Sequence, residues 1–84
     1  MKARVTVYPR AEILDPQGKA ICHALSRVGF DEVRDVRAGK CFDIDLGLED
    51  EGEARDRLDR MCQKLLANTV IEDYSIEVLG GDSL

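Results

Sequence analysis

This 84-residue chain has no tryptophan, only two tyrosines and two phenylalanines, and fewer basic than acidic residues. Small sheets that bind single-stranded RNA use paired aromatic side chains with basic flanks. A formal net charge of −5 also repels phosphate backbones and anionic membrane surfaces. The composition therefore argues against nucleic acid and membrane as partners.

Cysteine and histidine are scarce as well. Cys22, Cys41 and Cys62 are odd in number and far apart, and His23 is the single histidine. A disulfide framework or a zinc site needs paired or clustered ligands, so we expect neither and predict a reduced, cytoplasmic protein. No apolar run is long enough for a signal peptide or a membrane span.

A single domain of this size is only marginally stable unless disulfides, a metal or an oligomer support it. Because the first two are not expected, we expect a homodimer or a higher homo-oligomer.

Hydropathy patterns predict the first two elements. Ala3, Val5 and Val7 alternate with polar residues, as in a strand with one buried face, and Pro9 ends it. Asp15 then precedes a proline at a helix start, and apolar residues recur on one face up to Gly29. These signals predict a strand near the N-terminus and a helix over residues 16–28.

The remaining chain predicts a strand, a helix and a strand. Residues 33–48 alternate strongly, and residues 37–40 could be either a hairpin turn or a bend in one long strand. An acidic stretch, 49–53, suits the start of a helix, and residues 73–78 alternate again. The predicted apolar face of this second helix consists of Ala54, Leu58, Met61, Cys62, Leu65 and Leu66.

This order predicts an α+β fold in which two helices cover one face of an antiparallel sheet of three or four strands, as in a split β-α-β unit. Residues 1–79 form one domain, and residues 80–84 are expected to be a flexible tail. A central first strand would place Lys2 and Arg4 between acidic neighbours on both sides. These neighbours are Asp43 and Asp45 on one strand and Asp73 and Glu77 on the other.

Candidate catalytic groups are weak. Cys22 and His23 are adjacent, so on a helix they diverge and cannot act as a nucleophile and its base. The acidic run lacks calcium-loop spacing and is best explained as a solvated face. We therefore expect no catalytic, cofactor-binding or metal site, and the exposed segments 34–40 and 68–73 are left as candidate contact surfaces.

Three stretches carry a resemblance: ILDPQGKAICHAL (13–25), VRDVRAGK (33–40) and CQKLLANTVIEDYSIEV (62–78). In order and spacing they resemble the PurS family, the small subunit of phosphoribosylformylglycinamidine synthase, over residues 2–79. The resemblance implies a part in the fourth step of de novo purine biosynthesis. There a glutaminase subunit (PurQ type) releases ammonia, and a large synthetase subunit (PurL type) adds it to formylglycinamide ribonucleotide.

The resemblance further implies a non-catalytic, dimeric subunit that bridges the other two, while ATP, Mg and glutamine are used by the partner subunits. The chain is then part of an ATP-dependent C–N ligase complex. One position departs from the family, which commonly has an aromatic residue where this chain has Cys41. The predicted interface residues are Arg37, Gly39, Lys40, Asn68, Thr69, Ile71, Glu72 and Asp73.

Two alternatives remain open. A small sandwich with this element order could instead be a regulatory module that binds a small molecule, in the manner of amino-acid sensors. Asn68 and Ile71 could also have purely structural roles, with Asn68 capping the preceding helix and Ile71 entering the core.

Overall fold

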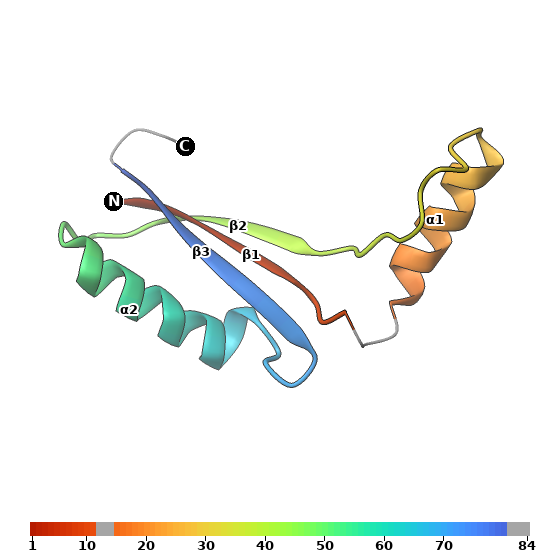
Figure 1. Cartoon of the computed structure of the whole chain (residues 1–84). Coiled ribbons are helices and arrows are strands. Elements are labelled where there is room, and N and C mark those ends of the chain that lie inside the picture. Colours follow the sequence, from red (N-terminus) through yellow and green to blue (C-terminus); the bar gives the residue numbers. More distant parts are fainter. Residues whose placement is uncertain (12–14, 81–84) are drawn as a thin grey trace.

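The computed structural model describes residues 1–11 and 15–80 (Figure 1). It has the predicted α+β class and the order strand, helix, strand, helix, strand. The second helix ends in a short π-helical segment, η1. The elements are β1 (Lys2–Pro9), α1 (Pro16–Arg27), β2 (Lys40–Asp45), α2 (Glu51–Met61), η1 (Cys62–Leu66) and β3 (Glu72–Gly80). Of the predicted tail, residue 80 belongs to β3, and residues 81–84 lie outside the described residues.

The sheet is three-stranded and antiparallel, with the order β2-β1-β3. The predicted central position of the first strand is confirmed. Lys2 Nζ lies 3.1 Å from Asp45 Oδ2, and Arg4 Nε lies 2.8 Å from Asp43 Oδ1. Such opposite charges across strands help to fix the register.

The β3 side agrees only in part with the predicted charge pairing. Arg4 lies opposite Glu77, as expected, but Asp73 lies opposite Tyr8, beyond the reach of Lys2 and Arg4. The register carries Asp73 to the end of β1, where it pairs with Arg10 instead.

The core lies between β1 and α2. Ala3, Val5 and Val7 are fully buried, and they pack with the buried Leu58 and Cys62 of the helix. Apolar side chains on the inner faces of β2 and β3 complete the cluster. They are Phe42, Ile44, Tyr74, Ile76 and Val78. A single helix, α2 with its π-helical end, therefore supplies the helical side of this core.

The π-helical end of the second helix changes which side chains face the core. The Ala67 N–H donates to the Cys62 carbonyl at 3.0 Å, a bond that spans five residues rather than four. The wider turn advances each residue through a smaller angle. Leu65 consequently points outward with 84% of its surface exposed, so its predicted place in the core is wrong, whereas Leu66 is half-buried.

The first helix does not lie over the sheet. Among the described elements only α2 with η1 covers it, and α1 stands beyond the end of the strands (Figure 1). The predicted arrangement, with both helices on one face, differs from the structure in this respect. The residues before β2 accompany α1 away from the sheet. Described residues 31–39 form neither a hairpin nor a strand. Instead they run back along α1 as an extended arm.

Contacts made by glycine and aspartate hold α1 against this arm. A Cβ atom on Gly18 would lie 2.0 Å from the Val36 carbonyl oxygen, so only glycine permits the approach. The Asp15 carboxylate accepts hydrogen bonds from the N–H groups of Gly18 at 3.0 Å and Ala38 at 2.8 Å. These two bonds, in that order of importance, lower the pKa of Asp15. Asp15 therefore caps the helix, as predicted, and also ties it to the arm.

Candidate functional site

The two predicted contact segments meet at the end of β1. Arg37 Nη1 donates to the Pro9 carbonyl at 3.1 Å, and its guanidinium lies 5.2 Å from the centre of the Tyr8 ring. In the β1–β3 ladder, Tyr8 is opposite Asp73 and Pro9 is opposite Glu72. Segments 37–40 and 68–73, far apart in sequence, are thus joined through the same two residues of β1.

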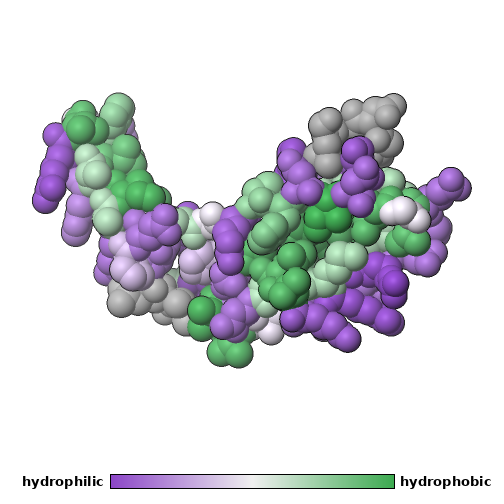
Figure 2. Space-filling model, turned by 180° about the vertical axis from the view of Figure 1, so that it is seen from behind, coloured by the Kyte–Doolittle hydropathy of each residue, from purple (hydrophilic) through white to green (hydrophobic). Residues whose placement is uncertain are grey.

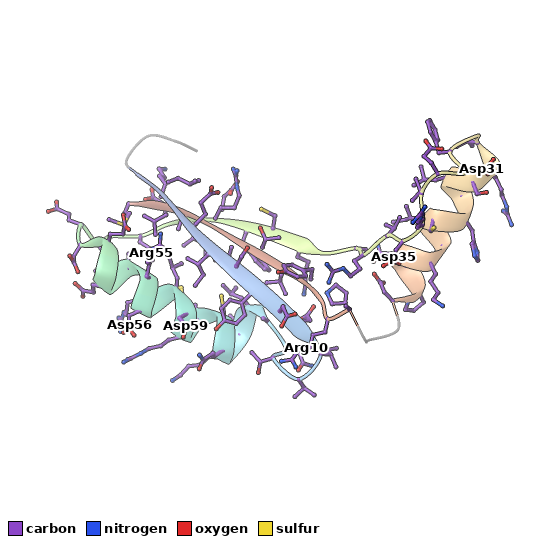
Figure 3. All side chains as sticks on the ribbon, viewed as in Figure 1. Arg10, Asp31, Asp35, Arg55, Asp56 and Asp59 are labelled. Carbon is purple, nitrogen blue, oxygen red and sulfur yellow. The ribbon has the colours of Figure 1, made fainter. Side chains whose placement is uncertain are left out.

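Arg10, just after β1, contacts segment 68–73 through its backbone and its side chain (Figure 3). Its backbone N–H donates to the Ile71 carbonyl at 2.9 Å, and its Nη2 donates to the Thr69 carbonyl at 2.6 Å. Arg10 Nε also lies 3.5 Å from Asp73 Oδ1. Arg10 was not among the predicted site residues, although a basic residue following Pro9 and a carboxylate pair at 72–73 form a charge signal in the sequence.

The turn at residues 68–71 is held by side chains as well as by backbone. The Asn68 carbonyl accepts from the N–H groups of Ile71 at 3.0 Å and Glu72 at 2.8 Å. The Asn68 side chain accepts from the Val70 N–H at 3.2 Å, and the Glu72 carboxylate accepts from the Asn68 N–H at 2.8 Å. Asn68 therefore shapes the turn rather than capping helix carbonyls with its side chain.

Exposure divides the predicted interface residues into two groups. Glu72 is half-buried and holds the turn, whereas Ile71 is 40% exposed and does not enter the core. Val70, which the prediction omitted, is 77% exposed. The exposed members of the site are Arg37, Gly39, Lys40, Asn68, Thr69, Val70, Ile71 and Asp73.

Gly39 has a steric role. A Cβ atom there would lie 2.5 Å from the Val7 carbonyl oxygen and 3.2 Å from Tyr8 Cβ. Lys40 follows at the first position of β2, opposite Val7, with an exposed side chain. Gly39 thus lets the arm join the sheet closely enough to place Lys40 and Arg37 at the same end.

Other candidate groups lie elsewhere. His23 is exposed, and the half-buried Cys22 thiol lies 3.6 Å from the Val33 carbonyl oxygen on the arm. Burial raises the pKa of the Cys62 thiol. Cys41 is exposed on the outer face of β2.

Within residues 1–11 and 15–80, no three His, Cys, Asp or Glu side chains are grouped as metal ligands, and no described helix could cross a membrane.

A small polar pocket lies beside the start of α1, between Asp15, Lys19, Asp35 and Arg37. Its volume is about 110 Å³, whereas sites for small molecules usually measure about 300–1,000 Å³. Both oxygens of Asp15 are already occupied by backbone N–H groups. The pocket thus offers little to a ligand of amino-acid size.

Comparison with known proteins agrees on one family. The family model described as PurS, phosphoribosylformylglycinamidine (FGAM) synthase, matches residues 2–80. Over 77 residues the chain is 46% identical to phosphoribosylformylglycinamidine synthase subunit PurS of Bacillus subtilis. That match covers 92% of this chain and 90% of the relative.

Solved structures give the same result. PurS of Methanocaldococcus jannaschii is described as one of the subunits of formylglycinamide ribonucleotide amidotransferase in the purine biosynthetic pathway. It superposes with a TM-score of 0.80 at 39% identity, over 90% of this chain and 92% of that one. A chain in the structure of PurLQS from Thermotoga maritima superposes with a TM-score of 0.84 at 28% identity, over 93% and 95% of the two chains.

Proposed function

The chain belongs to the PurS family of phosphoribosylformylglycinamidine synthase subunits, and we propose that it bridges the glutaminase and synthetase subunits of that enzyme. In this role it contributes a docking surface and no reacting group. The bridge lets ammonia released from glutamine serve the ATP-dependent formation of formylglycinamidine ribonucleotide, in the fourth step of de novo purine biosynthesis.

Such a bridge answers a chemical need. Ammonia is mostly protonated at neutral pH, and ammonium is not a nucleophile. Two active sites that are docked together keep the reactive form near its acceptor and away from bulk water. A subunit that only holds them in place can therefore be essential to glutamine-dependent turnover.

The observation that carries this proposal is the joining of segments 37–40 and 68–73 at the end of β1. Both segments belong to the stretches that resemble the family. Segment 37–40 is fixed by a hydrogen bond to Pro9, and segment 68–73 is fixed by one from Arg10 and by one between Asn68 and Glu72. A surface that is already fixed in the free chain loses little conformational freedom on docking. Its exposed Val70 and Ile71 supply apolar contact area beside the charged Lys40 and Asp73.

The partners follow from the likeness to the PurLQS chain of Thermotoga maritima. We assign a PurL-type synthetase and a PurQ-type glutaminase as the partners, with ATP, Mg and glutamine bound by those subunits. Self-association into a homodimer is part of the same proposal, because it supplies the second docking surface that a bridge requires.

Reconstitution tests the proposal. The two partner subunits are mixed with ATP, Mg and formylglycinamide ribonucleotide, with and without this chain, and amidine formation is measured with glutamine or with an ammonium salt. We expect the glutamine-dependent rate to need this chain, and the ammonium-dependent rate of the synthetase to be much less affected. Equal glutamine-dependent rates with and without the chain would refute the bridging role.

A further inference from the structure

A single carboxylate links the elements on the two sides of turn 68–71. The Tyr74 hydroxyl, on β3, donates a hydrogen bond to Asp59 Oδ1 on α2 (Figure 3). Gln63 Nε2, on η1, donates to Asp59 Oδ2 at 2.8 Å. Because Gln63 precedes the turn and Tyr74 follows it, both sides of the turn are bound to the same side chain.

Asp59 differs from the other charged residues of α2. It is half-buried, whereas the remaining acidic and basic side chains of this helix are exposed. A carboxylate that is partly withdrawn from water needs hydrogen-bond partners, and each oxygen of Asp59 has one. The hydrogen bond to Asp59 is also the largest influence on the Tyr74 hydroxyl and raises its pKa, so this hydroxyl keeps the proton that it donates.

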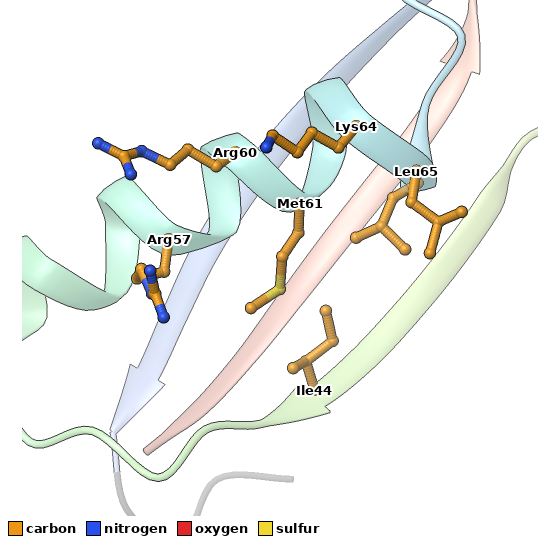
Figure 4. A pocket seen from close by; sticks show the side chains of 7 residues that line it. Ile44, Arg57, Arg60, Met61, Lys64 and Leu65 are labelled. Carbon is orange, nitrogen blue, oxygen red and sulfur yellow. The ribbon is translucent and has the colours of Figure 1, made fainter.

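The bonds to Asp59 lie on the β3 side of α2. On the other side, α2 and η1 face β2 across an open groove of about 440 Å³ (Figure 4). The apolar side chains that line this groove include Ile44 of β2 and Met61 of α2. Apolar contacts are not directional, whereas a hydrogen bond requires a particular distance and angle. The two bonds to Asp59 therefore fix how η1 is oriented relative to the start of β3.

This orientation sets the direction in which turn 68–71 points. Hydrogen bonds within the turn hold its shape, and two from Arg10 tie it to the end of β1. The bonds at Asp59 add a tie to α2. Val70 is 77% exposed and Ile71 40%. Figure 2 shows apolar atoms at the lowest point of the molecule, where the turn lies in Figure 1.

We propose that Asp59 is a positioning residue for the docking of this chain to a partner subunit. Its carboxylate holds turn 68–71 in the direction in which the turn contacts that subunit, although Asp59 itself lies outside the docking surface. The inference rests on the proposed bridging function and names a residue on which that function depends. Without the carboxylate the turn samples other directions, and docking then costs additional conformational entropy.

Two substitutions of Asp59 separate its hydrogen bonds from its charge. Asp59→Ala removes both acceptors. Asp59→Asn removes the charge but keeps the shape, because its amide oxygen can accept from Tyr74 and its amide nitrogen can donate to the Gln63 side-chain oxygen. Asp56→Ala is the matched control, since it removes a carboxylate from the exposed face of the same helix.

The reconstituted enzyme measures docking. This chain is titrated into fixed amounts of the two partner subunits, with the ammonium-dependent rate as the reference, and the concentration that gives half of the maximal glutamine-dependent rate is determined. We expect Asp59→Ala to raise this concentration about tenfold, and to reach a rate near that of the wild type at saturation. Asp59→Asn and Asp56→Ala should stay within about threefold of the wild type.

A loss of stability elsewhere controls for general loosening of the fold. Val78→Ala removes core contacts toward the opposite end of β3, where Val78 pairs with Ala3, and lowers the midpoint of thermal unfolding. We expect it to leave the half-saturating concentration near the wild-type value at a temperature at which circular dichroism shows both variants folded. An equal rise for Val78→Ala and Asp59→Ala overturns the positioning role.

A double variant tests the route by which Asp59 acts. Tyr74→Phe removes the hydrogen bond from β3 and leaves the carboxylate in place. If Asp59 acts through this bond, adding Asp59→Ala to Tyr74→Phe raises the half-saturating concentration little further. Effects of the two substitutions that simply multiply overturn the proposal.

The outcomes also distinguish this inference from the function on which it rests. Glutamine-dependent rates that are equal with and without the wild-type chain overturn the bridging role and the positioning role together. If the wild-type chain is required but Asp59→Ala half-saturates at the wild-type concentration, only the positioning role is overturned.

Discussion

Asn68 and Glu72 hold each other across one turn. The Glu72 carboxylate accepts from the Asn68 N–H at 2.8 Å, and the Asn68 carbonyl accepts from the Glu72 N–H, also at 2.8 Å. This reciprocal pair explains how the chain passes from η1 to β3 without a glycine or proline at residues 68–72. It also places Val70 and Ile71 at the exposed tip of the turn.

Replacing Glu72 should loosen this turn. In Glu72→Ala the Asn68 N–H loses its partner, and we expect the free energy of unfolding to fall by about 1 kcal/mol. Urea denaturation measures the change. Glu32→Ala, an exposed carboxylate between α1 and β2, serves as the control, with an expected change within about 0.5 kcal/mol. Equal effects of the two variants would contradict the structural role of Glu72.

Gly39 should not tolerate a side chain. In Gly39→Ala the new Cβ atom would lie 2.5 Å from the Val7 carbonyl oxygen, so the start of β2 must shift away from β1. Such overpacking typically costs about 1–3 kcal/mol. Gly47→Ala is the matched control, since nothing lies within 4 Å of its added atom. Thermal denaturation of both variants distinguishes this contact from a general preference for glycine.

The tie between α1 and the arm should depend on pH. Because its hydrogen bonds lower the folded-state pKa of Asp15, the stabilisation is present above the unfolded value of about 3.9 and is lost as pH falls through the folded value. Asp15→Asn should therefore exchange amide hydrogens faster than wild type in residues 16–27 at neutral pH. The difference should shrink in acid.

The hydrogen bond from Lys2 lowers the pKa of Asp45 as well. The pH dependence of hydrogen exchange in the wild-type chain therefore contains contributions from both carboxylates. Subtracting the Asp15→Asn profile isolates the part that belongs to Asp15. A difference between the two proteins that is independent of pH would show that the Asp15 charge does not hold the helix.

The docking surface should respond to a charge at its apolar tip. Val70→Glu changes a residue that is 77% exposed, so we expect a stability change within about 0.5 kcal/mol. If the tip contacts a partner subunit, glutamine-dependent turnover in the reconstituted enzyme should fall about tenfold or more. Ser75→Glu adds the same charge on the exposed face of β3 and should have little effect. Similar turnover with both variants would place the docking surface elsewhere.

Several features of the fold were predictable because their causes are local or pairwise. Alternation in residues 3–7 gave a buried strand, and Asp15-Pro16 marked the start of a helix. The opposite charges of Lys2 and Arg4 against Asp45 and Asp43 indicated the central strand, and the structure confirms both pairs.

The candidate site was predictable only in part. Segments 37–40 and 68–73 stand out in the sequence, but nothing local shows that Tyr8, Pro9 and Arg10 join them. In the sequence Glu72 looks like an exposed carboxylate, and only the folded turn shows that it accepts a hydrogen bond from the Asn68 N–H. Val70 was not among the predicted interface residues, and its 77% exposure depends on the conformation of the whole turn.

The sequence by itself determined the order of strands and helices, and the family to which the chain belongs. Periodicity, capping and cross-strand charge act over a few residues or between paired positions. Tertiary structure alone decided that α1 leaves the sheet and that Leu65 faces outward. The first depends on the approach of Gly18 to Val36 and the bond from Ala38 to Asp15, 23 residues away. The second depends on the π-helical segment η1, whose Cys62 and Ala67 are both buried in the core cluster with β1.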